Sequence, residues 1–323
     1  MKNLTFILLL ISFPSLAQTY FFEDFDYPDF ETLDSLYQND ARNSIWSTKH
    51  AVSTIDFNEN GVIDKEEEFK NSVIVLDPFN ANNKIIRFEL QRLDPFFYAK
   101  YSCDDSEINN VIPDSLLLSK YNAPKNLYCV DCNLSPLGTG SYEYKTHMNR
   151  NEIAIYGNRG DLYKAKKEHW FGLRMLIDEN YQIDNLNPGE IVTQFHSRGK
   201  KVINPPIALL IVKDRFKLTI TKNNDGKGES FDLGPVVKNK WIDWKYRIII
   251  SKSDKKGIVE VWKDGEKVLS QEGRNYIKNY PMYLKIGIYK WGWWDCNKDL
   301  NETSYKAISF DKVWADDKDM TQN

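Results

Sequence analysis

The sequence predicts an all-β protein, folded as a two-sheet jelly roll with a concave cleft. Apolar and polar residues alternate in many short runs, which is typical of strands with one buried face. Clusters of Asn, Asp, Gly and Lys separate these runs, as expected of turns. Helical spacing occurs only in a short stretch near residues 29–37. These observations favour strands throughout the chain.

The alternating runs give the predicted strands in chain order. Asp264-Gly265 lies between two apolar positions and predicts the turn of a hairpin. Strands are expected at residues 85–90, 216–221, 244–250, 258–262 and 307–313. Three further runs, at residues 147–155, 191–196 and 283–289, carry polar side chains on a face that could bind a ligand.

Residues 283–289 alternate strictly, so one face of this strand belongs to the core and the other is polar. The core face is formed by Leu284, Ile286 and Ile288. The opposite face carries two phenols and an ammonium, which suit the binding and deprotonation of an acidic sugar. These polar residues are Tyr283, Lys285 and Tyr289.

The other two polar runs follow the same rule. Gln194 and His196 project from one face of residues 191–196, and Arg150 and Glu152 share a face of residues 147–155. We expect the core side of these strands to be formed by Ile191, Phe195, Ile153 and Ile155. Together the three runs predict a polar floor on one sheet.

These residues resemble a known family. Arg150-x-Glu152, Gln194-x-His196 and Tyr283-x-Lys285-x-Gly-Ile-Tyr289 are similar to the three strand motifs of jelly-roll polysaccharide lyases, which have concanavalin-like sandwiches. The Gly-Ile-Tyr-Lys ending most resembles heparin lyase I and the glucuronan lyases, and the resemblance spans about residues 142–314. Alginate lyases often carry a second arginine where this chain has Ala154, which argues against alginate.

The resemblance implies β-elimination from a uronic acid, which leaves a 4,5-unsaturated uronate end. Arg150 and Gln194 would hold the uronate carboxylate and stabilise the developing negative charge. Tyr289 is the candidate acid, and His196 the candidate base or carboxylate partner. A phenol ordinarily titrates near pH ~10, so a tyrosine that also acts as base needs cations such as Lys285 or Arg150 nearby. One tyrosine could serve both roles on glucuronate, whereas iduronate requires a histidine across from it.

Other residues near the motifs have weaker signals. Glu152 is expected to orient Arg150, since an unpaired carboxylate would repel an anionic substrate. Two indoles continue the parity of Tyr289, and they could either stack on sugars or belong to the core. A cationic loop could bind sulfate or further uronates, or it could be an ordinary solvated loop. The indoles are Trp291 and Trp293, and the cations are Arg198, Lys200 and Lys201.

Residues 56–67 match the calcium-loop pattern D-x-[DN]-x-[DN]-G-x5-E without a mismatch. Acidic and amide oxygens on a tight glycine turn are the ligands that Ca²⁺ prefers. The ion would be structural, and the alternative is an acidic surface turn. The predicted ligands are Asp56, Asn58, Asn60, the Val62 carbonyl, Asp64 and Glu67.

The first 17 residues have a basic start, an apolar run and a small-x-small exit, which predicts a secretory signal cleaved before Gln18. We therefore expect a secreted protein with one domain at residues 18–323, into which the calcium loop is inserted. No later apolar run approaches the roughly 20 residues of a membrane span.

Disulfides are the default for an even set of cysteines outside the cytoplasm, with a redox pair or zinc site as the alternative. The cysteines are Cys103, Cys129, Cys132 and Cys296.

The formal net charge of −3 gives no signal for nucleic acid or an anionic membrane, and we expect a monomer that binds neither. An aromatic content of 14% leaves rings available to stack on sugars. The sequence thus favours a lyase for ulvan or glucuronan, then heparin-like glycosaminoglycans, then alginate. Two alternatives stay open: a non-catalytic glycan-binding module, and a glycoside hydrolase, which would need two positioned carboxylates.

Overall fold

The computed structural model describes the strands and their connections but not every residue of the chain. The described residues are 21–29, 32–33, 35, 46–50, 52–54, 68–70, 72–91, 150–156, 163–185, 189–197, 204–222, 228–276, 278–290, 303 and 305–322. The predicted signal segment, the calcium loop at 56–67 and the cysteines lie outside these residues.

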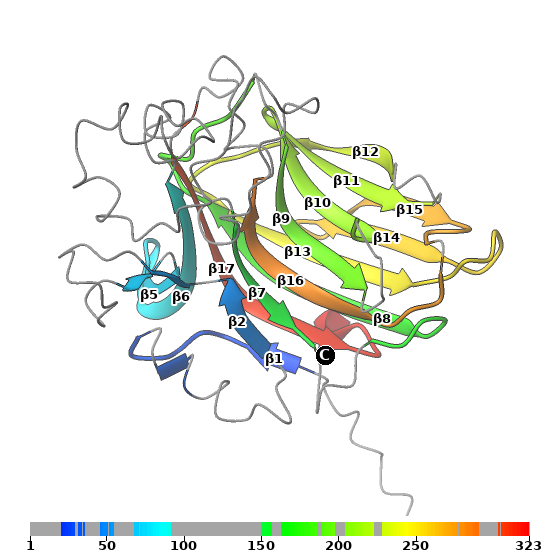
Figure 1. Cartoon of the computed structure of the whole chain (residues 1–323), viewed down its shortest axis with the longest axis horizontal. Helices are drawn as coiled ribbons and strands as arrows, with labels where there is room; N and C mark the ends of the chain where they lie inside the picture. Colours follow the sequence, from blue (N-terminus) through cyan, green and yellow to red (C-terminus); the bar gives the residue numbers. More distant parts are fainter. Residues whose placement is uncertain are drawn as a thin grey trace, which may run out of the picture.

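Two antiparallel sheets pack face to face, which confirms the predicted all-β sandwich (Figure 1). Sheet A has the order β15 (Glu266–Glu272), β14 (Ile258–Lys263), β13 (Trp241–Ile249), β8 (Glu168–Ile177), β17 (Tyr305–Asp316), β6 (Asn80–Gln91) and β5 (Ser72–Asp77), with β1 (Phe21–Glu23) beside β17. Sheet B has the order β12 (Gly228–Pro235), β11 (Arg215–Thr221), β10 (Ile207–Val212), β9 (Glu190–Ser197), β16 (Met282–Tyr289), β7 (Arg150–Ile155) and β2 (Trp46–His50). A separate pair joins β3 (Val52–Thr54) to β4 (Glu68–Lys70), and η5 (Met320–Gln322) is a final 3-10 turn.

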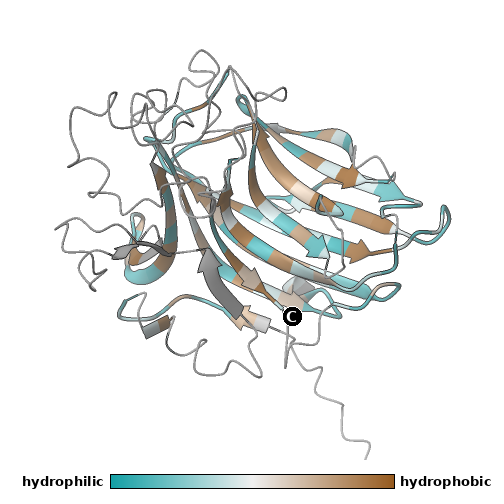
Figure 2. Ribbon diagram, viewed as in Figure 1, coloured by the Kyte–Doolittle hydropathy of each residue, from teal (hydrophilic) through white to brown (hydrophobic). Residues whose placement is uncertain are grey.

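All the strands predicted in the described ranges are present, and the alternation that predicted them is visible as hydrophobic and hydrophilic bands along the ribbon (Figure 2). The predicted hairpin joins β14 to β15, and both turn residues have positive φ, 51° for Asp264 and 82° for Gly265. This is the conformation that Asp-Gly favours in a two-residue turn. Several strands were not predicted, among them β5, β8, β10 and β12.

The core lies between the inner faces of the two sheets. In sheet B, Leu284, Ile286 and Ile288 of β16 are fully buried, as predicted. In sheet A, Trp244 and Tyr246 of β13 face them from the other layer. Each strand therefore has one side fixed by apolar burial, which leaves the outer faces of the sheets for polar side chains.

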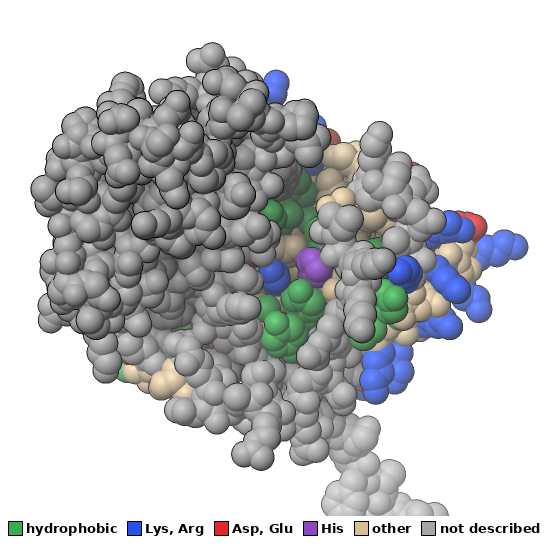
Figure 3. All heavy atoms as spheres, in the orientation of Figure 1, with side chains coloured by type: hydrophobic (Ala, Val, Ile, Leu, Met, Phe, Trp, Pro, Cys, Tyr) green, Lys and Arg blue, Asp and Glu red, His purple; other side chains and the backbone are tan. Residues whose placement is uncertain are grey.

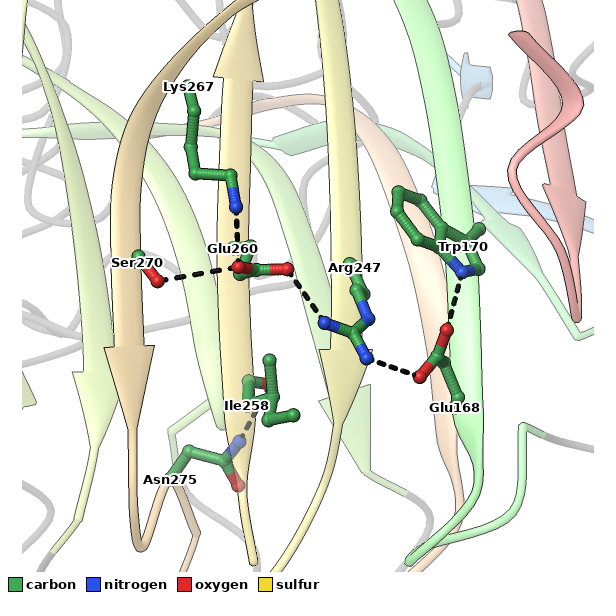
Figure 4. A network of polar contacts seen from close by, with 8 residues as sticks. All are labelled: Glu168, Trp170, Arg247, Ile258, Glu260, Lys267, Ser270 and Asn275. Carbon is green, nitrogen blue, oxygen red and sulfur yellow. Dashed lines mark hydrogen bonds and ion pairs between the residues drawn. The ribbon is translucent and has the colours of Figure 1, made fainter. Parts of the chain in front are cut away.

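The outer face of sheet A carries a network in which charges neutralise one another (Figure 4). Arg247 donates to Glu168 at 2.7 Å and to Glu260 at 3.0 Å, and Lys267 donates to Glu260 at 2.6 Å. Two cations and two carboxylates are matched here, so this network carries no net charge. Among the described residues, no helix has the length and apolarity needed to cross a membrane.

Candidate active site

The three polar runs lie on neighbouring strands of sheet B, in the order β9, β16, β7. Lys285 of β16 pairs with Gln194 of β9 on one side and with Ala154 of β7 on the other. Gly287 pairs with Glu152. We call the outer face of sheet B the site face. In the view of this face, a histidine, a cation and hydrophobic side chains are exposed together in a hollow (Figure 3).

Glu152 is the centre of a buried polar triad on the site face. Gln194 Nε2 donates a hydrogen bond to Glu152 Oε1, and Lys285 Nζ donates to Glu152 Oε2 at 3.2 Å. All three residues are buried, and Glu152 itself is only 2% exposed. The carboxylate binds across the strands to Gln194 and Lys285, and the expectation that Glu152 orients Arg150 stays a prediction. Of Arg150, only the backbone is described.

This pairing changes the roles expected of Lys285 and Gln194. The Lys285 ammonium is engaged by Glu152, so its charge neutralises the carboxylate and is not held out towards a ligand. Gln194 uses one N–H on Glu152, and a primary amide has a second N–H that can donate to a substrate. The triad is therefore a neutral floor that still offers an amide donor.

His196 lies with two tyrosines at one end of the site face. It pairs with Tyr283 across the strands, and their ring centroids are 5.3 Å apart. Tyr156, directly after β7, contacts the other side of Tyr283 at 5.0 Å. His196 Nδ1 lies 3.0 Å from the Ser197 carbonyl oxygen. A carbonyl can only accept, so Nδ1 carries the proton and, in the neutral ring, Nε2 does not.

Tyr289 lies at the opposite end of the site face, beside an apolar patch. It pairs with Arg150 of β7 and with Ile191 of β9, and it packs with Ile191, Ala208 and Leu210. Ile191 was predicted to point into the core, and this prediction is wrong. Register shifts between Leu209 and Leu210 of β10 and between Ile286 and Tyr289 of β16 place Ile191 on the site face. A bulge of this kind reverses the facing of the residues beyond it.

The strand register pairs Tyr289 with Arg150 and, at the other end of the polar floor, Tyr283 with His196. Ile191, the partner of Tyr289, is five residues before His196 on β9. At ~3.3 Å per residue, the backbones of the two rows are about 16 Å apart along the strand. Gln194 lies between them.

Gly287 allows β16 and β7 to approach each other next to Glu152. Its φ is 132°, and a Cβ atom there would lie 2.1 Å from the Asn151 carbonyl oxygen and 2.7 Å from the Glu152 Cα. Any larger residue would push the two strands apart. The position of the triad thus depends on a glycine between Lys285 and Tyr289.

Several predicted site residues lie outside the described residues, and their roles stay predictions. They are Arg198, Lys200, Lys201, Trp291, Trp293 and the six calcium ligands of the 56–67 loop. Within the described ranges, no group of three or more His, Cys, Asp or Glu side chains is arranged to hold a metal ion.

The sequence analysis missed two features of the site face. Tyr156 has the parity of Arg150 and Glu152, so extending the alternation by one step would have found it. The patch beside Tyr289 comes from the unbroken apolar run of β10, residues 207–212. Such a run indicates that both faces of a strand are buried.

Comparison with known proteins adds the family. Residues 127–317 match the family model described as polysaccharide lyase. The chain is also similar to the endo-β-1,4-glucuronan lyase from Trichoderma reesei, with 12% identity, a TM-score of 0.49, and coverage of 93% of this chain and 95% of that one. It is similar to an alginate lyase from Pseudomonas aeruginosa, with 19% identity, a TM-score of 0.37, and coverage of 51% and 73%. A search of curated protein sequences finds no match.

The assignment rests on the family model, whose matched residues include β7, β9 and β16 with the triad, His196 and Tyr289. Because the family model matches more than half of the chain, the protein belongs to the polysaccharide lyase family and is an enzyme of that class.

Proposed function

We propose that the protein is a secreted lyase that cleaves a glucuronate-containing polysaccharide, such as ulvan or glucuronan, by β-elimination. The substrate could carry sulfate groups or lack them. The bond from C4 to O4 breaks, a C4–C5 double bond forms, and the new chain end is a 4,5-unsaturated uronate. Family membership supports the reaction class, and the arrangement of the site face supports the sugar.

The observation that carries the choice of sugar is the row of Tyr289 with Arg150, about 16 Å along the strand from His196. Tyr289 shares its row with an arginine, whereas the backbone of His196 lies on the far side of Gln194. This arrangement favours a mechanism in which Tyr289 acts as both base and acid. Glucuronate presents H5 and O4 on the same side, where a single tyrosine reaches both.

In the proposed reaction Arg150 and the second N–H of Gln194 bind the uronate carboxylate. Charge withdrawn into these donors makes the C5 proton more acidic and stabilises the enolate-like transition state. The Tyr289 oxygen, as phenolate, takes the C5 proton, and the C5–H electron pair becomes the double bond. The same phenol then gives its proton to the departing O4, so the tyrosine returns to its starting state.

The remaining residues of the site face suit an extended anionic chain. Lys285 neutralises Glu152, so the floor beneath the substrate does not repel carboxylates. His196 and the ring of Tyr283 would bind a neighbouring sugar, with His196 as its carboxylate partner. The cations Arg198, Lys200 and Lys201 are proposed to attract further uronates or sulfates. Calcium at residues 56–67 is proposed as a structural ion.

The test is to incubate the protein with glucuronan, ulvan, an iduronate-containing glycosaminoglycan and alginate, and to follow the ultraviolet absorbance of the unsaturated product. We expect turnover on the glucuronate polymers. Tyr289→Phe should lower kcat by ~10²- to 10⁴-fold. His196→Ala should raise KM more than it lowers kcat, because it removes binding to a sugar that does not react.

Tyr305→Phe is the matched control, since Tyr305 binds Arg87 and Glu89 on the other sheet and should leave kcat unchanged. Turnover only on the iduronate polymer, or a larger loss of kcat in His196→Ala than in Tyr289→Phe, would contradict the single-tyrosine mechanism. No absorbance change on any uronate polymer would contradict the proposed function as a whole.

A further inference from the structure

A cluster of four ionised side chains is buried inside the sandwich, next to the row that contains Tyr289. Lys290 Nζ lies 3.1 Å from Asp184 Oδ2 and 3.4 Å from Glu190 Oε1, and Lys306 Nζ lies 2.5 Å from Glu190 Oε1. None of the four side chains is more than 1% exposed. Lys306 also donates to the Gln182 carbonyl oxygen. We call these four residues the ionic cluster.

The ionic cluster connects strands from both sheets at one end of the sandwich. Glu190 is the first residue of β9, and Lys290 directly follows β16, both in sheet B. Lys306 belongs to β17 of sheet A, and Asp184 lies in the segment after β8. The cluster thus fixes the ends of three strands relative to one another.

Two of its members are direct neighbours of the proposed reacting row. Lys290 follows Tyr289, and Glu190 precedes Ile191, the residue that pairs with Tyr289. The ladder of β16 with β7 is regular up to Tyr289, but between Ile286 and Tyr289 the register of β16 on β9 shifts. Beyond this shift, Lys290 ties the end of β16 to Glu190, the first residue of β9, and to Asp184.

General stability is a poor explanation for the cluster. Buried ion pairs are often replaced by apolar residues of similar volume with no loss of stability, whereas the loss of one partner is costly. Lys290 continues the inward parity of Leu284, Ile286 and Ile288, where an apolar side chain would be the simpler choice. Burial also lowers the pKa of the Lys306 ammonium, which Glu190 opposes. Four matched charges in such a place specify one arrangement of the strands.

We propose that Asp184, Glu190, Lys290 and Lys306 are positioning residues that hold Tyr289 in place against β9, which carries Gln194 of the polar triad. The inference rests on the proposed function, because it assumes that Tyr289 transfers the proton. The cluster does not touch the substrate. It acts through the backbone of β16, by preventing the strand end from shifting by a residue or tilting away from β9.

The test separates position from stability with single and double variants. Lys306→Met and Glu190→Gln each leave a buried charge without its partner. We expect each to lower kcat at least ~10-fold with KM changed less than ~2-fold, since a misplacement of about 1 Å can cost 10²-fold in rate. Product absorbance gives kcat and KM, and urea unfolding gives stability.

The double variant Glu190→Gln with Lys306→Met removes a matched pair and leaves Lys290 with Asp184. It should recover much of the kcat lost in either single variant. If the two substitutions acted independently, the double variant would instead have a lower kcat than either single variant. It also keeps the test decisive if a single variant does not fold. If the double variant folds and its kcat stays as low as that of the poorer single variant, the positioning role is wrong.

Lys245→Met is the matched control, because Lys245 is ion-paired with Asp319 at 2.7 Å on the outer face of sheet A. It should lower stability without changing kcat. If the cluster variants behave like this control, the cluster serves stability alone and the inference falls. Normal turnover in Tyr289→Phe would contradict the proposed role of Tyr289, and with it the premise of this inference. If Tyr289→Phe is inactive but the cluster variants are fully active, only the positioning role is wrong.

Discussion

Glu152 determines the arrangement of the polar side chains at the site. Its two oxygens each accept from a different strand, Gln194 of β9 and Lys285 of β16. A buried carboxylate is tolerated only when it is paired and hydrogen-bonded, and here both conditions are met. The pairing also holds two side chains that would otherwise be flexible. Glu152 thus has a structural role at the centre of the candidate site.

Glu152→Gln should destabilise the fold by about 3–5 kcal/mol, because it leaves the Lys285 ammonium buried without a countercharge. Urea unfolding measures the free-energy change. Glu168→Gln is the control, since its partner Arg247 lies on a solvent-facing sheet surface, where a pair contributes about 0–1 kcal/mol. Equal, small losses in both variants would show that the triad contributes little.

At the residue scale, the sequence predicted which side chains share a face but not which of them bind each other. Alternation is a local property, so the common facing of Tyr283, Lys285 and Tyr289 follows from spacing alone. The partner of Glu152 depends on strands more than forty residues away along the chain, as with Gln194. Sequence spacing could therefore suggest only the neighbour Arg150, and the register of the sheet adds Gln194 and Lys285 as partners.

At the element scale, β16 carries the site because it lies between β9 and β7 and contains an irregular step. Its alternation predicted the core residues correctly on the basis of apolar burial. The register shift near Ile191 could not be predicted from the sequence, because residues 191–196 alternate like a regular strand. The shift is a property of the pairing of β9 with β10 and β16. A bulge is set by the pairing of strands more than by the composition of one strand.

Gly287→Ala should weaken both stability and turnover. The added methyl would overlap the Asn151 carbonyl oxygen and would also sit at a φ that L-residues rarely adopt, so β16 and β7 must separate beside Glu152. We expect a loss of at least ~1–3 kcal/mol, measured by urea unfolding, and a lower kcat.

Gly265→Ala is the matched control for this change. Gly265 also has a positive φ, 82°, but nothing lies within 4 Å of a Cβ atom added there. The control therefore carries the backbone strain without the overlap, and it should leave kcat unchanged. Equal losses of stability and kcat in the two variants would show that the positive φ alone explains the effect. The close approach of β16 and β7 would then play no part in it.

At the scale of the whole molecule, the two-sheet class was predictable but the order of the strands was not. Turn signals and alternation recur along the chain, and these are enough to indicate a sandwich. The order β9, β16, β7 joins strands that are distant in sequence, and nothing in a single strand specifies which distant partner it takes. The resemblance of the three motifs to those of jelly-roll lyases predicted that these strands share a site, although their pairing was not known.

Calcium is expected to stabilise the whole fold through the 56–67 loop. An ion that binds only the folded loop adds stability by mass action, about 2.7 kcal/mol at 100 times its Kd. A chelator should therefore lower the Tm and added Ca²⁺ should restore it, as measured by thermal unfolding. Glu67→Gln should weaken that response, because Glu67 is the predicted bidentate ligand. The same Tm with and without a strong chelator would reject the site.

The spacing between the rows of Tyr289 and His196 has a consequence for how the enzyme measures its substrate. A short oligosaccharide could place one uronate at Tyr289 without extending to His196. It would then lack the binding energy of the row that contains His196 and Tyr283. Binding energy from remote parts of a substrate is used to orient the reacting bond, so truncation lowers the rate of the reaction as well as affinity. Under the proposed function, the site face therefore favours long chains, and turnover slows as the products become short.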